Sequence, residues 1–291
     1  MPVRDSFTTE DYARGSGVGT EPSGLCGQWQ EIDEHWQLKG VLWRCSCSVL
    51  AVRTGREIVA SGFVAYGPSH LIVLSIFVVG VFVLIALGRR QRDSPSAVHF
   101  SGVFACAIVA VTVPLQILQF LPGEWNLRTS LPLQICDFAW VVAAYALWTH
   151  RLLPVTLTYL WGITLTSQGL LTPDLASEFP EPRFLMFWGM HLLIIWASFY
   201  LVLGLGIRPD WANYRRTVLI TFGWAVSVFM FNVVVGTNYG YLNRKPARAS
   251  LLDFLGPWPL YVVVEIAIVA TVWALLVWPW VSVRRRRAPT S

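Results

Sequence analysis

Seven apolar runs of about 18 to 23 residues are the feature that most restricts how this chain can fold. A helix rises 1.5 Å per residue, so about 20 apolar residues are needed to cross a hydrocarbon core of ~30 Å. These runs predict an all-α fold, a polytopic membrane helix bundle with seven transmembrane helices. The predicted spans are Leu71–Gly88, Phe100–Phe120, Leu131–Thr149, Leu152–Leu171, Phe184–Gly206, Thr217–Val235 and Pro259–Val281.

The composition excludes a disordered chain and argues against a soluble globular domain. Hydrophobic residues make up 55% of the chain and charged residues only 13%, whereas an ordinary soluble domain is about 25% charged. The net charge of +5 resides in the loops and does not indicate nucleic-acid binding. The 5 cysteines include no C-x-x-C pair, and the sequence has no phosphate-binding loop, H-E-x-x-H or G-x-S-x-G motif. We therefore expect neither a metal site nor a cofactor.

Three regions are predicted. Residues 1–57 are polar and lack a positively charged start followed by an apolar core, so we expect no cleavable signal peptide and a disordered N-terminal tail. Residues 58–283 form the seven-helix transmembrane domain, and residues 284–291 form a basic C-terminal tail that contacts lipid headgroups.

Arginines in alternate loops predict the orientation in the membrane, because cytoplasmic loops retain basic residues. One set of loops holds Arg89, Arg92, Arg208 and the run Arg284–Arg287, and the other set holds fewer basic residues. The pattern predicts a multi-pass protein of the cell membrane with its N-terminus outside and its C-terminus in the cytoplasm.

Strongly polar residues converge on the outer half of the predicted bundle. Such groups are costly in hydrocarbon, so within a span they usually face the bundle interior and mark a site. The opposite half is expected to hold almost none. The converging residues, contributed by six of the seven helices, are His70, Gln134, Cys136, Asp137, Gln168, His191, Asn232 and Glu265.

Cys136 and His191 lie at similar predicted depth and are a candidate nucleophile and base. The alternatives are that Cys136 is a small packing residue and that His191 makes a single interhelical hydrogen bond. The supporting groups would orient the ring or stabilise an oxyanion. They are Gln134, Asp137, Gln168, Asn232, Glu265, Asn238 and the backbone N–H groups that follow Gly236.

A long outer loop between the last two spans reads GTNYGYLNRKPARASLLDFLGPWPLY and predicts an ordered lid. Its basic residues run against the charge bias, so an anionic ligand or a lipid headgroup is expected there, with an ordinary solvated loop as the alternative. The tyrosines Tyr239, Tyr241 and Tyr261 are interpreted as interfacial anchors. The predicted substrate-binding residues are Asn238, Tyr239, Arg244, Lys245, Arg248 and Asp253.

Four sequence features together resemble the YwaF-like family of bacterial integral membrane proteins. They are LPLQICD at residues 131–137, LTPDL at residues 171–175, His191, and GTNYGYLNRKP followed by LLDFLGPWPLY. The resemblance covers roughly residues 63–280. That family is similar to eukaryotic TMEM-type acyltransferases that remodel ether phospholipids, and more remotely to androgen-induced lipid hydrolases. The resemblance implies His191 as the base and Cys136 as the nucleophile; bacterial members usually carry a histidine where this chain has Gln134.

Three hypotheses follow. The first is a phospholipid acyltransferase or lipid thioesterase that uses a membrane-embedded Cys136 and His191 pair. The second is a non-catalytic transporter or seven-helix sensor that binds a small ligand or proton through Asp137 and Glu265, although the absence of visible inverted repeats counts against a transporter. The third is a structural lipid-binding bundle. Membrane phospholipids are the expected partners in the first and third hypotheses.

Overall fold

The computed structural model describes residues 63–246 and 250–287 of the 291-residue chain. The tail predicted for residues 1–57 lies outside the described residues. Arg248 and residues 288–291 lie outside them as well.

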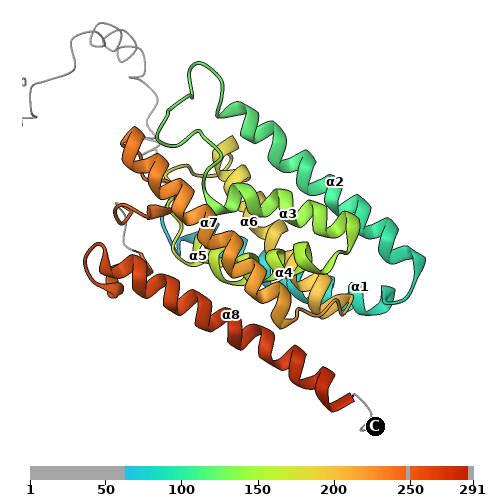
Figure 1. Ribbon diagram of the computed structural model, residues 1–291. Coiled ribbons are helices and arrows are strands. Elements are labelled where there is room, and N and C mark those ends of the chain that lie inside the picture. Colours follow the sequence, from blue (N-terminus) through green and yellow to red (C-terminus); the bar gives the residue numbers. More distant parts are fainter. Residues whose placement is uncertain (1–62, 247–249, 288–291) are drawn as a thin grey trace, which may run out of the picture. The chain divides into compact units, whose positions relative to one another are not determined.

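In the described residues the chain forms seven helical stretches and no strand (Figure 1). The all-α prediction is therefore confirmed for this part of the chain. The short 3-10 turns η3 (Tyr239–Tyr241) and η4 (Leu251–Leu255) lie in the last connection. The seven stretches are α1 (Pro68–Gln91), α2 (Pro95–Leu118), α3 (Ile135–Thr149), α4–η1–α5 (Leu152–Leu160, Trp161–Thr166, Ser167–Leu171), α6–η2 (Pro182–Phe199, Tyr200–Gly204), α7 (Trp211–Val235) and α8 (Leu260–Arg287).

Among the described residues, 5 helices are long and apolar enough to cross a membrane. They correspond to α1, α2, α6–η2, α7 and α8, and they confirm a polytopic helical bundle. The helix α3 is apolar but has only 15 residues, and the α4–η1–α5 stretch is not among the five. Seven membrane spans therefore remain a prediction. The last helix continues past the predicted boundary at residue 283 and ends at Arg287.

The start of α3 differs from the prediction. The helix begins at Ile135 instead of Leu131, because Pro132 lacks an N–H group and disfavours helical geometry in the residue before it. Gln134 has extended backbone angles, and the Asp137 carboxylate accepts a hydrogen bond from the Gln134 N–H at 3.0 Å. Cys136 therefore lies in the first turn of its helix and not five residues inside it.

Successive helical stretches alternate in direction. The His70 ring at the start of α1 hydrogen-bonds the carbonyl of Leu170 at the end of α5, at 2.8 Å. Arg92, which follows α1, donates to the carbonyl of Gly204 at the end of η2, at 2.7 Å. We call the end of the bundle at which α1, α3, α6 and α8 begin the Cys136 end. The end at which they finish is the arginine end.

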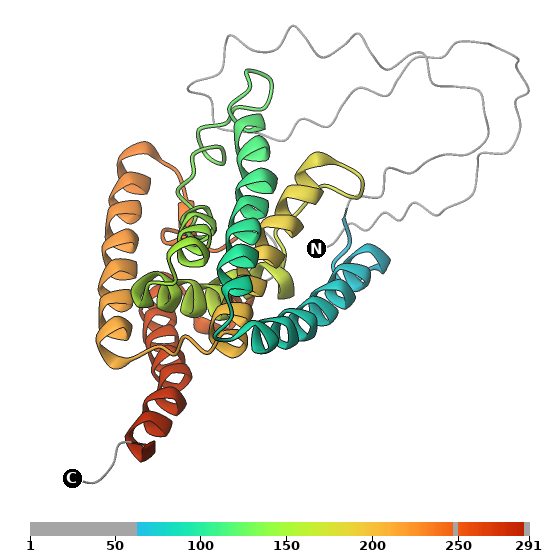
Figure 2. The same cartoon turned by 90° about the vertical axis from the view of Figure 1, so that its right-hand side faces the viewer.

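The α6–η2 stretch occupies the middle of the bundle. It contacts α1, α2, α3 and α4. In its apolar 18-residue segment 61% of the residues are buried, against 11% in the corresponding segments of α1 and α7. Figure 2 shows α1 and α7 on opposite sides of this central layer. The outer helices therefore direct most of their apolar surface away from the protein, as helices that face lipid do.

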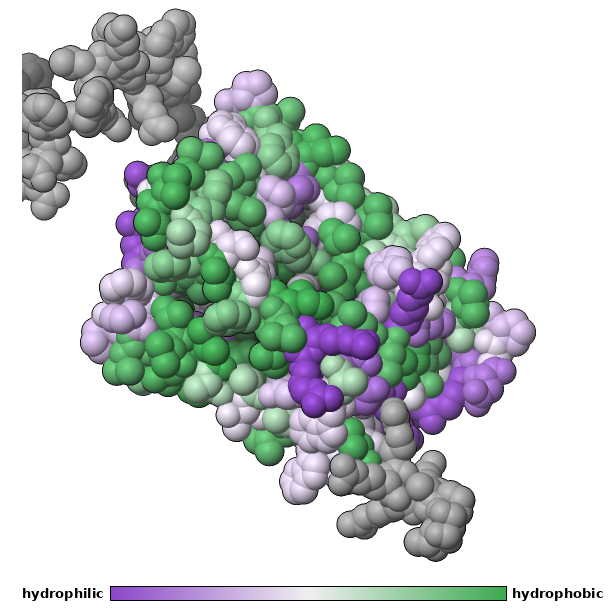
Figure 3. Space-filling view, viewed as in Figure 1, coloured by the Kyte–Doolittle hydropathy of each residue, from purple (hydrophilic) through white to green (hydrophobic). Residues whose placement is uncertain are grey.

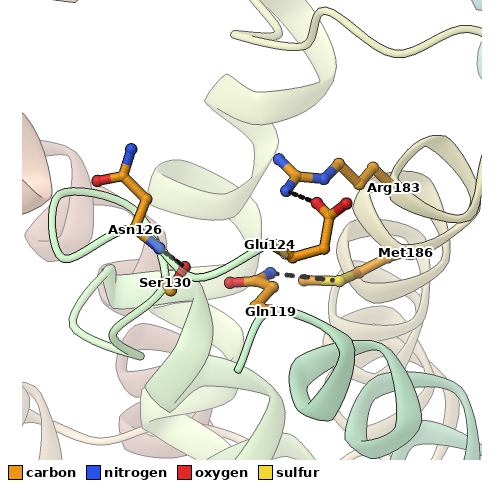
Figure 4. Close-up of polar contacts among 6 residues, drawn as sticks. All are labelled: Gln119, Glu124, Asn126, Ser130, Arg183 and Met186. Carbon is orange, nitrogen blue, oxygen red and sulfur yellow. Dashed lines mark hydrogen bonds and ion pairs between the residues drawn. The ribbon is translucent and has the colours of Figure 1, made fainter. Parts of the chain in front are cut away.

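The connection between α2 and α3 is tied to the start of α6 (Figure 4). Arg183 forms an ion pair with Glu124, and the Gln119 amide donates to the Met186 sulfur at 3.4 Å. Within the connection, the Asn126 N–H donates to the Ser130 hydroxyl at 2.9 Å. These contacts fix the loop that leads into Cys136 against the central helix.

The expectation that the half opposite the Cys136 end holds almost no polar groups is wrong. At the arginine end, the Tyr200 hydroxyl donates to Gln91 at 2.8 Å, and the buried Ser101 hydroxyl lies 3.5 Å from Tyr200 and 2.8 Å from the His150 ring. Burial lowers the pKa of His150, which lies between two helices. Short hydroxyl side chains satisfy one another or a nearby carbonyl, so they cost little inside a span and leave no strong signal in the sequence.

Candidate functional site

Cys136 is half-buried in the first turn of α3. Its thiol lies close enough to the Thr166 hydroxyl to interact with it. The Thr166 hydroxyl is fully buried and makes no hydrogen bond of normal geometry within the described residues. A candidate nucleophile thus lies beside a buried hydroxyl that still has a donor and an acceptor to offer.

His191 is buried in α6, and one ring nitrogen has a defined partner. The Nδ1 atom lies 2.6 Å from the carbonyl oxygen of Phe187. A carbonyl only accepts, so the proton of the neutral ring is on Nδ1 and the lone pair is on Nε2. Within the described residues Nε2 has no hydrogen-bond partner. The ring is therefore held in the tautomer that a general base needs.

The His191 ring packs directly on the backbone of Gly169 in α5. A side-chain carbon at residue 169 would come within 2.6 Å of both Nε2 and Cδ2 of the ring. Only glycine allows this approach, so Nε2 reaches the α5 backbone.

Cys136 and His191 thus contact the same helical stretch. Thr166 and Gly169 are three residues apart, which is about 4.5 Å along a helix and nearly the same face. Thr166 is also the last residue of the π-helical segment η1, and π-helical segments occur frequently at functional sites. The points at which Cys136 and His191 approach this stretch are therefore about one helical turn apart.

Two predicted supporting residues fix the start of α3. The Gln134 side-chain oxygen accepts a hydrogen bond from the N–H of Gly240 at 2.8 Å, which joins the helix start to the long loop. Asp137 uses a carboxylate oxygen on the Gln134 N–H. Both residues therefore hold the first turn of α3, where Cys136 lies, and within the described residues neither hydrogen-bonds the His191 ring.

Three further predicted residues hold the long loop together. The Asn232 carbonyl oxygen accepts from the Thr237 hydroxyl at 2.7 Å and from the Tyr239 N–H at 2.8 Å, and its amide donates to the Tyr239 carbonyl. The Tyr239 hydroxyl donates to the Leu127 carbonyl and accepts from the Leu131 N–H, which ties the loop to the α2–α3 connection. Asn238 bonds the backbone of Arg244. These contacts hold the long loop against α7 and against the α2–α3 connection.

Gln168 and Glu265 lie on different helices. Gln168 is half-buried on α5, and its side chain makes no hydrogen bond within the described residues. Glu265 is half-buried on α8, one turn after Tyr261. The buried Tyr261 hydroxyl donates to the Tyr241 carbonyl, so α8 and the long loop meet there.

Two basic residues of the long loop, Arg244 and Lys245, lie at the Cys136 end. Arg244 is exposed. Lys245 lies 3.9 Å from the Asp253 carboxylate and 5.7 Å from the centre of the Tyr261 ring. Asp253 also accepts from the Ser250 N–H at 2.8 Å and so caps η4.

Tyr241 is a functional candidate that the sequence-based interpretation as an interfacial anchor missed. Its hydroxyl donates to Asp174 of the LTPDL segment at 2.9 Å, and it lies within electrostatic reach of Cys136. Its φ is 54°, which is strained for a residue other than glycine. Burial and the neighbouring Asp174 carboxylate raise the pKa of Tyr241 above its usual range, so the hydroxyl stays protonated. Only the pairing of two distant loops reveals this residue.

Comparisons with known proteins agree with the resemblance to TMEM-type membrane proteins, whereas the narrower assignment to YwaF-like bacterial proteins stays a prediction. No curated protein and no solved structure matches the chain. The five apolar helices and the family match together identify an integral membrane protein that crosses the bilayer several times. The match to the TMEM164 family extends over residues 65–277, and the chain therefore belongs to the TMEM164 family.

Proposed function

We propose that this protein is a phospholipid acyltransferase, or a lipid thioesterase when water is the acceptor, with Cys136 as nucleophile and His191 as general base. The observation that carries the proposal is the state of the His191 ring. Its Nδ1 proton is committed to the Phe187 carbonyl, and its Nε2 lone pair lies on the wall that Cys136 also contacts. A thiol and an imidazole base are the minimal pair for acyl transfer through a thioester.

The reaction balances with these two groups. Nε2 of His191 takes the proton of the Cys136 thiol, and the sulfur attacks the ester carbonyl carbon of a donor phospholipid. The carbon–oxygen ester bond breaks, and the leaving lysophospholipid oxygen receives the proton from Nε2. An acceptor hydroxyl then loses its proton to Nε2 and attacks the thioester. The carbon–sulfur bond breaks, and Nε2 returns the proton to the thiolate.

The first turn of α3 offers a site for the oxyanion of the tetrahedral intermediate. The leading N–H groups of a helix have no partner within that helix, and within the described residues those of Ile135 and Cys136 donate to no other residue. The Thr166 hydroxyl is a further donor close to the sulfur. Arg244 and Lys245 would hold the phosphate of the donor or acceptor lipid at the same end of the bundle.

The test is acyl transfer by the full chain in phosphatidylcholine vesicles that contain an acyl-labelled donor and a lysophospholipid acceptor. Cys136→Ala and His191→Ala should each lower the transfer rate by at least about 1,000-fold, since each removes one half of the pair. The wild type should accumulate a hydroxylamine-sensitive acyl label on the protein, and Cys136→Ala should not.

The chain offers matched controls. Cys106 is an exposed cysteine on α2, and His99 is an exposed histidine on the same helix. Cys106→Ala and His99→Ala should transfer acyl groups at the wild-type rate. Equal turnover in the wild type and Cys136→Ala, with both proteins folded, would refute the proposal. Ligand-dependent or proton-dependent uptake in that variant would instead favour the transporter or sensor hypothesis.

A further inference from the structure

A second site lies at the opposite end of the bundle from Cys136. A cavity of about 260 Å³ opens between the end of α1, the segment after η2 and the end of α8. None of the described residues that line it is acidic. Its lining includes Arg89, Arg92, Arg208, Trp280, Val202 and Leu203.

Two of the arginines are anchored by carbonyls at the end of η2. Arg89 Nε donates to the Leu203 carbonyl at 3.4 Å, and an Arg92 terminal nitrogen donates to the Gly204 carbonyl at 2.7 Å. These carbonyls belong to the negative end of the helix dipole, which compensates part of the positive charge. A guanidinium has five N–H donors, so each side chain keeps donors for a further group. The third arginine, Arg208, lies 5.9 Å from the centre of the Trp280 ring.

Glycines bring these groups together. A side-chain carbon at Gly204 would lie 3.1 Å from the Gly88 Cα, so α1 and η2 are in backbone contact. Gly206 has a φ of 82°, and a side-chain carbon there would lie 3.0 Å from the Arg92 guanidinium carbon. The Arg92 guanidinium therefore packs on bare backbone. The Arg92 side chain is exposed, but the local backbone holds its guanidinium in place.

We propose that this cavity binds the phosphate group of an anionic phospholipid. Converging guanidiniums repel one another, and an anion between them removes that cost while using the donors that remain. The apolar lining and the neighbouring helices point to a lipid as the source of the phosphate. Only 11% of the apolar 18-residue segment of α1 and 17% of that of α8 are buried, so both helices present apolar surface beside the cavity. Figure 3 shows hydrophilic surface gathered toward the end at which α8 finishes, next to apolar surface.

The test measures lipid binding by the full chain in detergent micelles, with fluorescent phosphatidylglycerol as the probe. Unlabelled phosphatidylglycerol should displace the probe, and phosphatidylcholine should not. Arg89→Gln combined with Arg92→Gln should weaken binding by about fivefold for each guanidinium removed. Arg208→Gln, on a different segment, should show the single-residue effect even if the double variant unfolds.

Arg90 provides the matched control, because it adjoins Arg89, is exposed and does not line the cavity. Arg90→Gln should bind the probe as the wild type does. An equal loss in Arg90→Gln would reduce the effect to general surface charge and overturn the proposal, as would equal binding of phosphatidylglycerol and phosphatidylcholine. Displacement by inorganic phosphate at the concentrations that suffice for the lipid would assign the cavity to free phosphate and overturn its assignment to a lipid.

Discussion

The two ends of the bundle handle polar groups in different ways. At the Cys136 end, uncharged side chains and carboxylates bind the backbone of long loops, as Asn232 and Gln134 do. At the arginine end, guanidiniums bind helix carbonyls and keep donors for an anion. Near Cys136, hydrogen bonds between side chains and loop backbone hold the surrounding segments in place. At the other end, the arginines bind helix carbonyls and keep further donors. The proposed acyl transfer and the proposed lipid binding therefore lie at opposite ends of the bundle.

A pair of asparagines on α7 gives the strongest test of this comparison. Asn232 makes three hydrogen bonds to the loop that follows the helix. Among the described residues, the Asn213 side chain bonds only Asp210, which caps α7, and Arg216, in the second turn of the same helix. Asn232→Ala should lower the free energy of unfolding by about 3 kcal/mol, because each lost bond to a buried group costs about 1 kcal/mol. Asn213→Ala should cost about 1 kcal/mol. Unfolding in mixed micelles measures both, and equal losses would contradict the comparison.

The backbone contact at the arginine end is the next test. Gly204→Ala places a methyl group against the Gly88 backbone and should destabilise the protein by about 2 kcal/mol, since packed backbone cannot yield. Gly223 on α7 has open space, with nothing within 4 Å of the point where a methyl group would lie, and Gly223→Ala should instead stabilise the helix by about 0.5–1 kcal/mol. In the lipid-binding assay, Gly204→Ala should bind phosphatidylglycerol more weakly than the wild type, and Gly223→Ala should bind it as the wild type does.

Gly169→Ala sharpens the comparison at the Cys136 end. The added methyl group would displace the His191 ring, so acyl transfer should fall by at least about tenfold while phosphatidylglycerol binding at the other end stays unchanged. Gly102→Ala, where a methyl group meets nothing within 4 Å, should leave both measurements at wild-type values. A parallel loss of both activities in Gly169→Ala would show that the two ends are not separable.

The smallest expected effect concerns pH. The hydrogen bond from Tyr241 to Asp174 should contribute about 1 kcal/mol, which Tyr241→Phe removes. Because the pKa of Tyr241 is raised in the folded protein, this difference should be constant below about pH 10, the ordinary tyrosine value. Above about pH 10, Tyr241 loses its hydroxyl proton in the unfolded chain before it does so in the folded protein. The free energy of unfolding of the wild type should therefore fall toward that of the variant. Unfolding curves at increasing pH check this, and a difference that grows with pH would contradict it.

The prediction of helices succeeded where apolar length decides the outcome. The runs at residues 71–88 and 217–235 lie within α1 and α7, because a run of that length has few other structures in a membrane. The start of α3 was missed because Pro132 and the cap at Gln134 outweigh the hydropathy of Leu131 and Leu133. Hydropathy reports solubility in lipid and not where a backbone first becomes helical.

The candidate site was predictable in part. Cys136 and His191 stand out as a rare thiol and imidazole within apolar runs. Tyr241 does not stand out, because its partner Asp174 is 67 residues away and belongs to another loop. The tautomer of His191 depends on Phe187 and Gly169, and nothing in a linear pattern connects these two residues to the ring.

The sequence by itself determined that this protein is an α-helical membrane bundle with a few polar groups in its spans, because the cost of exposing a backbone or a charge to lipid is set by composition and length. Only the tertiary structure decided which of those polar groups hydrogen-bond the loops and which keep a donor or acceptor for another partner. Hydrogen bonds saturate, so a side chain's role depends on the partners that packing brings to it.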